Sequence, residues 1–367
     1  MFSCGKNRLR IYSLNGGCVV TEKGYFPPFK SASGGIKELM LIYNNYGANW
    51  TPMDALPYVA YLDNLTKEPV VKDWFFDAFL FLALLSEKGR AFDSPQRATP
   101  AIKEDWQWYI NDLFRPNRQL SAFNEAYKIA KPHLDKNTKG KVFVMIPNPM
   151  DEITEFGLID GENLDFSSKD PEEATRQRFK AVKWFVDNVI EQYRQANFDN
   201  LELVGFYWVE EMIHFETAGE TNLVQKVADY LHQLGLKFCW IPWFRAAGHD
   251  IWAKVGFDFC IHQPNYMFND SVPKERFEYV TKDAKEFYQG IEIEADPRVL
   301  ESVVARERFR DYLRAGITYG YMNEAIHGYY QDVKVFGIAA YSEDPNVRAI
   351  YDDVYKFVKG TWLEGLK

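Results

Sequence analysis

Short apolar runs alternate along this chain with longer segments in which apolar residues recur every three or four positions. An apolar run bounded by polar residues or glycine predicts a buried strand, and the three-to-four spacing predicts an amphipathic helix. The pattern predicts eight strands, over residues 38–44, 74–82, 141–147, 202–209, 237–242, 257–263, 290–295 and 318–322. Their spacing averages roughly 40 residues, which suits a strand, a helix and two loops.

The intervening segments carry the signals of helix ends. Asp170 and Pro171, followed by two glutamates, are typical of a helix N-terminus, because aspartate caps the free amides and proline fits the first turn. An apolar stripe over residues 224–234 predicts a helix that ends at Gly235. Further helices are predicted over residues 298–315, ending at Gly316, and over residues 347–362.

Eight strand–helix units favour a closed (β/α)8 barrel over an open doubly wound sheet. An open sheet usually carries a glycine-rich phosphate-binding turn after its first strand, and the chain has no GxGxxG or GxxxxGK motif. We therefore predict an irregular N-terminal arm over residues 1–35 and a single barrel domain over residues 36–367. A long insertion between strands two and three, residues 86–140, is expected to hold two helices.

Composition narrows the classes of partner. Apolar residues make up 47% of the chain, enough for a large core. The net charge is −9 and no dense run of Lys and Arg occurs, which disfavours nucleic acid as a partner. No apolar stretch is long enough to span a membrane. Aromatic residues reach 16%, and those near strand ends would suit the flat C–H faces of sugar rings.

The cysteines predict neither a metal site nor a disulfide framework. Cys239 and Cys260 lie in successive predicted strands and are expected to be buried free thiols, and no CxxC pair or Cys/His cluster occurs. Cys4, in the segment Met1–Lys6, resembles the lipidated cysteine of a bacterial lipoprotein signal, although the preceding apolar segment is missing. Two alternatives stay open: an exported lipoprotein whose start is truncated, or a chain with no export signal.

A barrel presents its reactive groups at the carboxyl ends of its strands. Trp208 and Trp243 either form the floor of a sugar subsite or belong to the core. Asp77, within the second apolar run, either faces the site or is a buried hydrogen-bonding anchor. The candidate binding residues at the predicted strand ends are Tyr43, Asn44, Asp77, Asn148, Trp208, Trp243, Gln263, Asn265, Tyr266, Glu292 and Asn323.

The seventh predicted strand has an unusual alternation. Strands of a parallel barrel usually read as continuous apolar runs, but residues 291–295 place two glutamates, Glu292 and Glu294, on the face opposite two isoleucines. The glutamates must then point into the barrel or its mouth, where a carboxylate has to be paired, hydrogen-bonded or protonated. The alternative is a structural ion pair or an exposed strand edge.

Two more acids, Glu210 and Glu211, follow the fourth strand. Alternation allows only one of them to face the barrel axis, and the sequence leaves open which one, or whether both are solvated loop residues. Glycoside hydrolysis needs one carboxylic acid to protonate the leaving oxygen and a second carboxylate as nucleophile or base. Strands four and seven face each other across a barrel mouth, so their acids can flank one bond.

This layout resembles the large clan of retaining glycosidases whose acid/base lies on strand four and whose nucleophile lies on strand seven. The resemblance implies that Glu211 or Glu210 is the acid/base and Glu294 the nucleophile, and that Tyr266 matches the strand-six tyrosine that assists the nucleophile. The chain departs from the clan in one respect. The clan usually has Asn immediately before its strand-four Glu, and here that position holds Val209 or Glu210.

Four motifs together resemble a narrower group, the bacterial domain-of-unknown-function family 4855. They are WFFDAFLFL at 74–82, GFYW at 205–208 with its following Glu, QPNY at 263–266 and GIEIE at 290–294. The resemblance implies a glycosidase-like barrel, common among exported proteins of polysaccharide-degrading bacteria, with no established activity.

Other chemistries lack their motifs. The chain has no HExxH, no HxH on the first strand and no GxSxG, so we expect neither a metal nor a cofactor, and no acyl transfer. We predict a glycoside hydrolase acting on a poly- or oligosaccharide. The alternatives are a non-catalytic carbohydrate-binding barrel, such as a surface lipoprotein, and an isomerase or lyase that acts on a sugar-like substrate.

Overall fold

Eight parallel strands close into a barrel, as the alternating pattern predicted. The computed structural model describes residues 22–44, 48–63 and 70–364. Each strand pairs with the next around the ring, and the last pairs with the first. The strands are β1 (Glu38–Tyr43), β4 (Ala78–Leu82), β5 (Gly140–Ile146), β8 (Leu201–Trp208), β9 (Lys237–Trp240), β10 (Phe259–His262), β11 (Gly290–Glu294) and β12 (His327–Tyr330).

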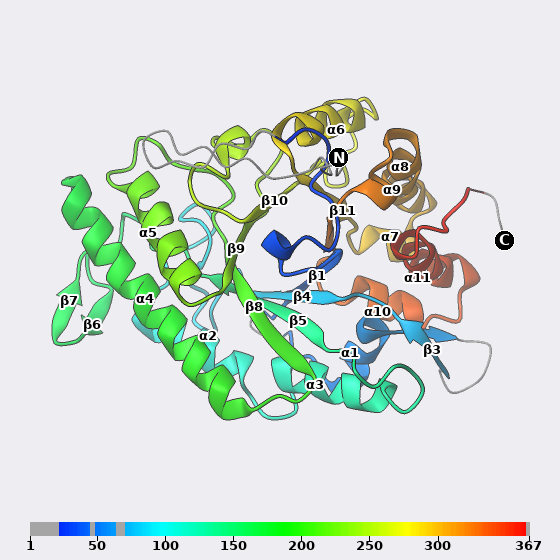
Figure 1. Cartoon of the computed structure of the whole chain (residues 1–367), viewed down its shortest axis with the longest axis horizontal. Coiled ribbons are helices and arrows are strands. Elements are labelled where there is room, and N and C mark those ends of the chain that lie inside the picture. Colours follow the sequence, from blue (N-terminus) through cyan, green and yellow to red (C-terminus); the bar gives the residue numbers. More distant parts are fainter. Residues whose placement is uncertain (1–21, 45–47, 64–69, 365–367) are drawn as a thin grey trace, which may run out of the picture.

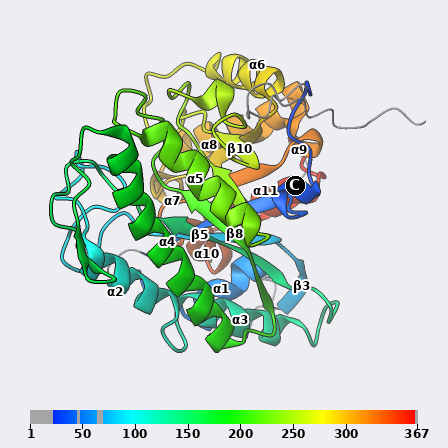
Figure 2. The same cartoon turned by 60° about the vertical axis from the view of Figure 1, so that its left-hand side comes forward.

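Helices surround the ring, and α4 and α5 lie side by side on its outside (Figure 1 and Figure 2). The helices are α1 (Pro52–Val59), α2 (Lys103–Leu113), α3 (Gln119–Ala130), α4 (Pro171–Ala196), α5 (Glu220–Gln233), α6 (Arg276–Phe287), α7 (Arg298–Glu301), α8 (Val303–Tyr319), α9 (Tyr321–Glu324), α10 (Val335–Ala340) and α11 (Pro345–Val358). Two hairpins lie outside the barrel: β2 (Ala60–Asp63) with β3 (Val70–Trp74), and β6 (Gly157–Ile159) with β7 (Glu162–Leu164).

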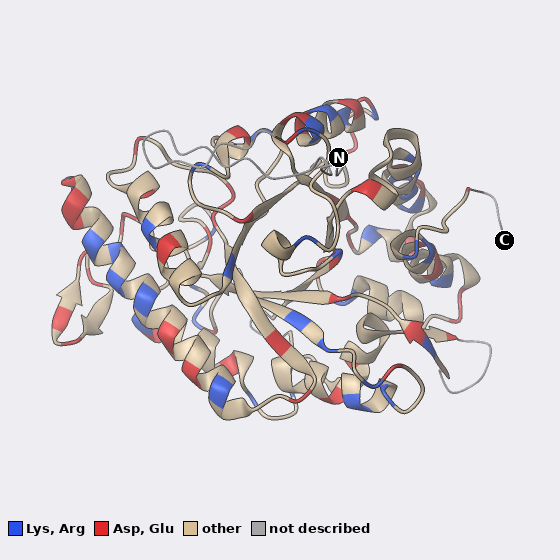
Figure 3. Ribbon diagram, in the orientation of Figure 1, with Lys and Arg blue, Asp and Glu red and all other residues tan. Residues whose placement is uncertain are grey.

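Helix α4 shows how the local signals act. The Asp170 side chain accepts a hydrogen bond from the Glu173 amide at 2.8 Å, and Pro171 occupies the first turn, as predicted. Valines and phenylalanines on one face pack against the barrel, and charges of both signs alternate along the rest of the helix (Figure 3). At the end of α5, Gly235 has φ 74°, which confirms the predicted helix stop.

The second predicted strand splits at its centre. Trp74 ends the hairpin strand β3, and β4 begins only at Ala78. Between them, the half-buried carboxylate of Asp77 accepts hydrogen bonds from the backbone amides of Lys37 and Glu38, at 2.9 and 2.8 Å. Asp77 therefore anchors the amino end of β1 to β4. The expectation that it lines a site at the carboxyl ends is wrong, because it lies at the opposite end of the barrel.

The eighth strand was also misplaced by the pattern. Residues 318–322 belong to the end of α8 and the short α9, and the true strand β12 follows. Gly316 lies inside α8 rather than after it. The position needs a glycine because a Cβ there would lie 2.5 Å from the Phe357 ring of α11. The helix ends instead at Gly320, with φ 89°. Asn323, in α9, precedes β12 and is exposed, so its predicted place in the site is wrong.

The amino end of the barrel is closed by the chain before β1, which includes a 3-10 turn over Ser31–Ser33. Gly34, with φ 68°, approaches Val204 so closely that a Cβ would lie 2.3 Å from that side chain. Lys141 of β5 donates to the Gly35 carbonyl at 2.9 Å. These contacts seal one end and leave the carboxyl ends of the strands as the open end.

Cys239 and Cys260 are buried free thiols, as predicted. Cys4 and Cys18, and with Cys4 the predicted lipid anchor, lie outside the described residues. Within the described part of the chain, no helix is long and apolar enough to cross a membrane.

Candidate active site at the open end of the barrel

A cavity of about 870 Å³ lies at the carboxyl ends of the strands. Register decides which strand residues face it, because residues paired across parallel strands share one face of the sheet. Tyr43, Tyr207 and Tyr330 come from β1, β8 and β12 and lie on its wall. Of the residues singled out from the sequence, the wall holds Tyr43, Asn148, Glu210, Glu211, Trp243, Gln263, Asn265 and Glu292.

Glu210 and Glu211 both line the cavity. The expectation that strand alternation would admit only one of them is wrong, because β8 ends at Trp208 and the chain is no longer pleated when it reaches the two acids. Glu210 accepts a hydrogen bond from Asn148 at 2.8 Å, and its other oxygen lies 3.5 Å from His214. Glu210 raises the pKa of His214 to about 9, so the imidazole is cationic at neutral pH.

Glu211 has a different environment from its neighbour. Burial, with a smaller contribution from the nearby acids Glu210, Asp93 and Glu294, raises the pKa of Glu211 to about 8, although a hydrogen bond from Gln263 lowers it. The carboxyl is therefore protonated at neutral pH and can donate a proton into the cavity. The surroundings of the two glutamates differ: Glu210 accepts a hydrogen bond from Asn148 and lies beside the His214 cation, and Glu211 has neither contact.

Glu292 projects from β11 into the same cavity. It pairs in register with Gly328 of β12, where the absence of a side chain leaves room for it. Its side chain is only 3% exposed, and it makes no hydrogen bond to the described residues. Burial, together with Glu294 and Glu211 nearby, raises its pKa well above the ordinary value. Glu292 and Glu211 thus lie on one cavity wall, and neither makes an ion pair with a described residue.

Glu294 lies on the same strand face but is not on the cavity wall. Its side chain is fully buried, and its two oxygens accept hydrogen bonds from the amides of Asn265 and Tyr266, at 2.8 and 3.1 Å, and from the hydroxyl of Tyr312. Burial raises its pKa to about 7 although these donors lower it. Glu294 holds the loop after β10 against the end of β11.

The tyrosine hydroxyl bound to Glu294 therefore comes from α8. The expectation that Tyr266 supplies it is wrong, because the Tyr266 hydroxyl donates to Asp311 at 2.9 Å, and only the Tyr266 amide reaches Glu294. The sequence could not have shown this, since Tyr312 lies 46 residues after Tyr266 in a helix that the pattern assigned to packing alone.

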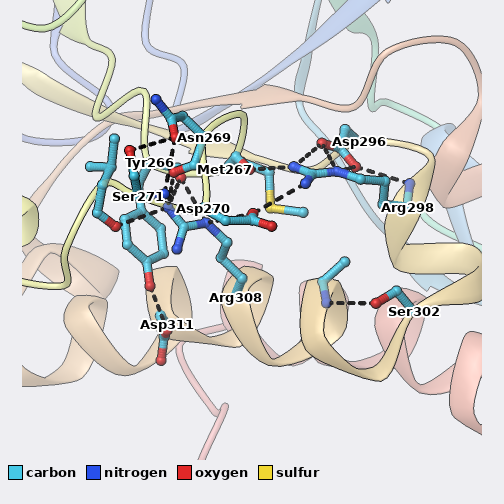
Figure 4. Close-up of polar contacts among 12 residues, drawn as sticks. Tyr266, Met267, Asn269, Asp270, Ser271, Asp296, Arg298, Ser302, Arg308 and Asp311 are labelled. Atoms are coloured by element: carbon cyan, nitrogen blue, oxygen red, sulfur yellow. Dashed lines mark hydrogen bonds and ion pairs between the residues drawn. The ribbon is translucent and has the colours of Figure 1, made fainter.

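The loop after β10 is held by two arginines (Figure 4). Arg308 donates to the Tyr266 and Val272 carbonyls, and Arg298 donates to the Met267 carbonyl while it pairs with Asp296 at 2.7 Å. Carbonyl acceptors and a guanidinium make strong, charge-assisted hydrogen bonds. The loop is thereby fixed in the conformation that presents Asn265 and Phe268 to the cavity.

Aromatic rings form one side of the cavity. Trp243 and Phe268 are 45% and 44% exposed, and Phe268 meets Tyr330 edge-on at 5.1 Å between ring centroids. Tyr330 in turn meets Tyr43 at 5.6 Å. Trp208 is not part of this surface, because it shares a register with Trp240 on the outer face of the barrel and packs on Phe238. Trp208 thus belongs to the core, the second of the two alternatives that the sequence left open. Asn44 also faces outward, toward Asp112, so its predicted place in the site is wrong.

The sequence missed several charged residues of the wall. Asp93 and Arg97 come from the long insertion, and His214, Glu220 and Arg178 come from the loop after β8 and the helices that flank it. Their positions carry no motif, and only the fold brings them together. No group of three or more residues that could hold a metal ion occurs in the described part of the chain.

Comparisons with known proteins place the chain in a family and leave its activity open. The family described as "Domain of unknown function (DUF4855)" matches residues 38–356. No curated protein matches the sequence. Among solved structures, a tryptophan synthase from M. tuberculosis in its aminoacrylate-bound form is 11% identical, covering 90% of this chain and 97% of its own, with a TM-score of 0.39. A GH18 chitinase from Pseudoalteromonas aurantia is 11% identical, covering 85% and 98%, with a TM-score of 0.40. Likenesses of this size carry no argument about function.

Proposed function

Because this chain belongs to the DUF4855 family, whose description names no activity, we propose its function from its own cavity: it is a glycoside hydrolase. The observation that carries the proposal is the presence of two carboxyl groups on one cavity wall, the half-buried Glu211 and the buried Glu292. Glu211 follows the fourth barrel strand, β8, and Glu292 lies in the seventh, β11, which are the two strands that the sequence singled out. A cavity with two such groups and exposed aromatic rings suits a sugar chain better than a small charged metabolite.

Glu211 is the proposed general acid. Its raised pKa, about 8, keeps it protonated at neutral pH, which is the state needed to donate a proton to a glycosidic oxygen. Its neighbour Glu210 is less suited to that step, because it accepts a hydrogen bond from Asn148 and lies beside the cationic His214.

Glu292 is the proposed second carboxylate. After the glycosidic oxygen takes its proton from Glu211, the C–O bond breaks, and a carboxylate either bonds to the anomeric carbon or removes a proton from an attacking water. The reaction therefore needs Glu211 protonated and Glu292 ionised, so that the cavity provides one acid and one base. Glu294, which the glycosidase resemblance implies as the nucleophile, is shielded from the cavity and hydrogen-bonded on both oxygens.

The shielding of Glu294 favours a second candidate, a barrel that binds a glycan without cleaving it. If that carboxylate is the family's reactive group, this conformation keeps it from a substrate, and the cavity then serves for recognition. The two candidates differ in whether products form, and they predict the same bound ligand class.

The deciding experiment is a screen of polysaccharides for released reducing ends, with the parent protein beside Glu211→Gln, Glu292→Gln and Glu294→Gln. We expect the first two changes to lower kcat by about 10²- to 10⁴-fold, the usual contribution of a positioned acid or base. Glu202→Gln is the matched control, because Glu202 is exposed near the amino end of β8. Parent-like rates in both cavity variants would refute the assignment. A confirmed ligand with no product would favour the binding protein.

A further inference from the structure

Acidic side chains predominate on the cavity wall. Apart from its tyrosines, the wall holds ten acidic or basic residues, of which seven are acids and three are bases. The acids are Asp93, Asp151, Glu152, Glu210, Glu211, Glu220 and Glu292, and the bases are Arg97, Arg178 and His214. An excess of one sign inside a hollow with low-dielectric walls selects ligands by charge.

Each of the three bases on this wall already has an acidic partner. Two are guanidinium–carboxylate pairs with short contacts, and the third is an imidazole beside a carboxylate. The pairs are Arg97–Asp93, Arg178–Glu220 and His214–Glu210, with nitrogen–oxygen distances of 2.8, 2.7 and 3.5 Å. The wall therefore offers no unengaged cation to a carboxylate or sulfate, and an acidic polysaccharide would meet repulsion there.

Four acids remain without a basic partner on the wall. Glu292 is 97% buried and has no hydrogen-bond partner among the described residues, which is a costly state for a carboxylate unless a ligand completes it. Glu211 lies on the same wall. Asp151 and Glu152 lie in the loop after β5, and Asp151 is only 3.6 Å from the highly exposed Lys169. Three of the four, Glu152, Glu211 and Glu292, make no ion pair with a described residue, and a cationic ligand would supply that partner.

We infer that the cavity takes a glycan whose sugars carry free amino groups, with ammonium groups paired to Glu292 inside and to Glu152 and Asp151 nearer solvent. The inference deepens the proposed hydrolase, since it names the substrate class of the same site. An ammonium at C2 is bonded to the neighbour of the anomeric carbon. A carboxylate that can reach that carbon is therefore also within salt-bridge reach of the ammonium.

The exposed rings support the same ligand class. Trp243 and Phe268 line the cavity and are partly exposed, and an aromatic ring attracts both the C–H surface of a sugar and a nearby cation. An ammonium beside Glu292 and Glu211 also favours their ionised forms, because an opposite charge lowers the pKa of a carboxyl group. Binding of an amino sugar should therefore release protons, and binding of its acetylated counterpart should not.

The test is calorimetric binding of matched glycan pairs near pH 5.5, where the amino sugars are charged and Glu211 and Glu292 retain their protons. The pairs are fully deacetylated and fully acetylated chito-oligosaccharides, and galactosamine oligomers with their acetylated forms, and oligogalacturonate is the acidic probe. We expect each amino form to bind roughly tenfold tighter than its acetylated partner and to weaken as salt rises from about 50 to about 500 mM. Measurements in two buffers of different ionisation enthalpy report the released protons.

Glu152→Gln is the matched variant, with Glu155→Gln in the same loop but off the wall as its control. Glu152→Gln should weaken amino-sugar binding about three-fold and leave the acetylated partner unchanged. The inference is overturned if the acetylated or acidic probe binds as tightly as the amino form, or if no amino form binds. Binding is measured without turnover, so the two proposals can fail separately. Selective binding of amino sugars without cleavage would refute only the hydrolase proposal. Cleavage of neutral glycans alone would refute only this inference.

Discussion

Removal of Arg178 should destabilise the protein in a pH-dependent way. Arg178 is 1% exposed in α4; it pairs with Glu220 at 2.7 Å and donates to the Ala218 carbonyl at 2.7 Å. Arg178→Met keeps most of the side-chain volume and leaves the Glu220 carboxylate buried without its cation. Removal of one partner of a buried ion pair costs about 3–5 kcal/mol.

The destabilisation depends on pH because the unpaired Glu220 carboxylate can lose its charge by taking up a proton. With an ordinary pKa of 4.5, protonation costs about 5 kcal/mol near pH 8 and about 1 kcal/mol near pH 5. The deficit of Arg178→Met should therefore be largest in alkali and should shrink as the pH falls. An unfolding entropy of about 2.1 cal/mol/K per residue over 367 residues converts about 4 kcal/mol into a Tm decrease of about 5 °C.

The assay is urea and thermal unfolding, followed by tryptophan fluorescence, of the parent, Arg178→Met and the double variant Arg178→Met/Glu220→Gln. The double variant removes the stranded charge and should recover much of the loss near pH 8. A Tm within about 1 °C of the parent at pH 8 would refute the reasoning, as would a double variant no more stable than the single one.

Three further predictions concern other parts of the barrel. Gly205→Ala would place a methyl 2.2 Å from a backbone oxygen of β9 and should lower the free energy of unfolding, measured in urea, by more than about 3 kcal/mol. Gly161→Ala, which has open space around it and φ 80°, should lower it by about 1 kcal/mol, and equal losses in the two variants would contradict this. Folded Glu211 retains a proton that the unfolded chain loses, so its contribution to the free energy of unfolding falls between about pH 4.5 and 8, and Glu211→Gln should flatten that dependence; an unchanged slope would count against the buried carboxyl. Tyr312→Phe removes the acceptor of the Met267 amide, at 2.9 Å, and should cost about 1–2 kcal/mol and speed hydrogen exchange at that amide; parent-like exchange would argue against the clamp.

Where the sequence pattern failed, packing had overridden a local signal. Residues 318–322 look like a strand because they are aromatic and β-prone, but they continue a helix that packs on α11. The real strand, β12, is four residues long and contains a glycine and a histidine, so it has little apolar signal. Gly316 has the identity of a helix stop, yet it is a contact point for Phe357. The helical state of residues 318–322 and the contact of Gly316 both depend on residues distant in the sequence.

By its residues alone, the chain determined the barrel class, seven of the eight strands in outline and the presence of two glutamates on one face of β11. These features follow from periodicity, because the alternation of side chains along a strand can be recognised in the sequence without knowledge of the neighbouring strands. The tertiary structure decided which carboxyl groups share a cavity. Glu294 is withdrawn by amides and a hydroxyl from distant segments, and Glu292 stays on the wall, because hydrogen-bond partners and solvent access belong to the assembled fold.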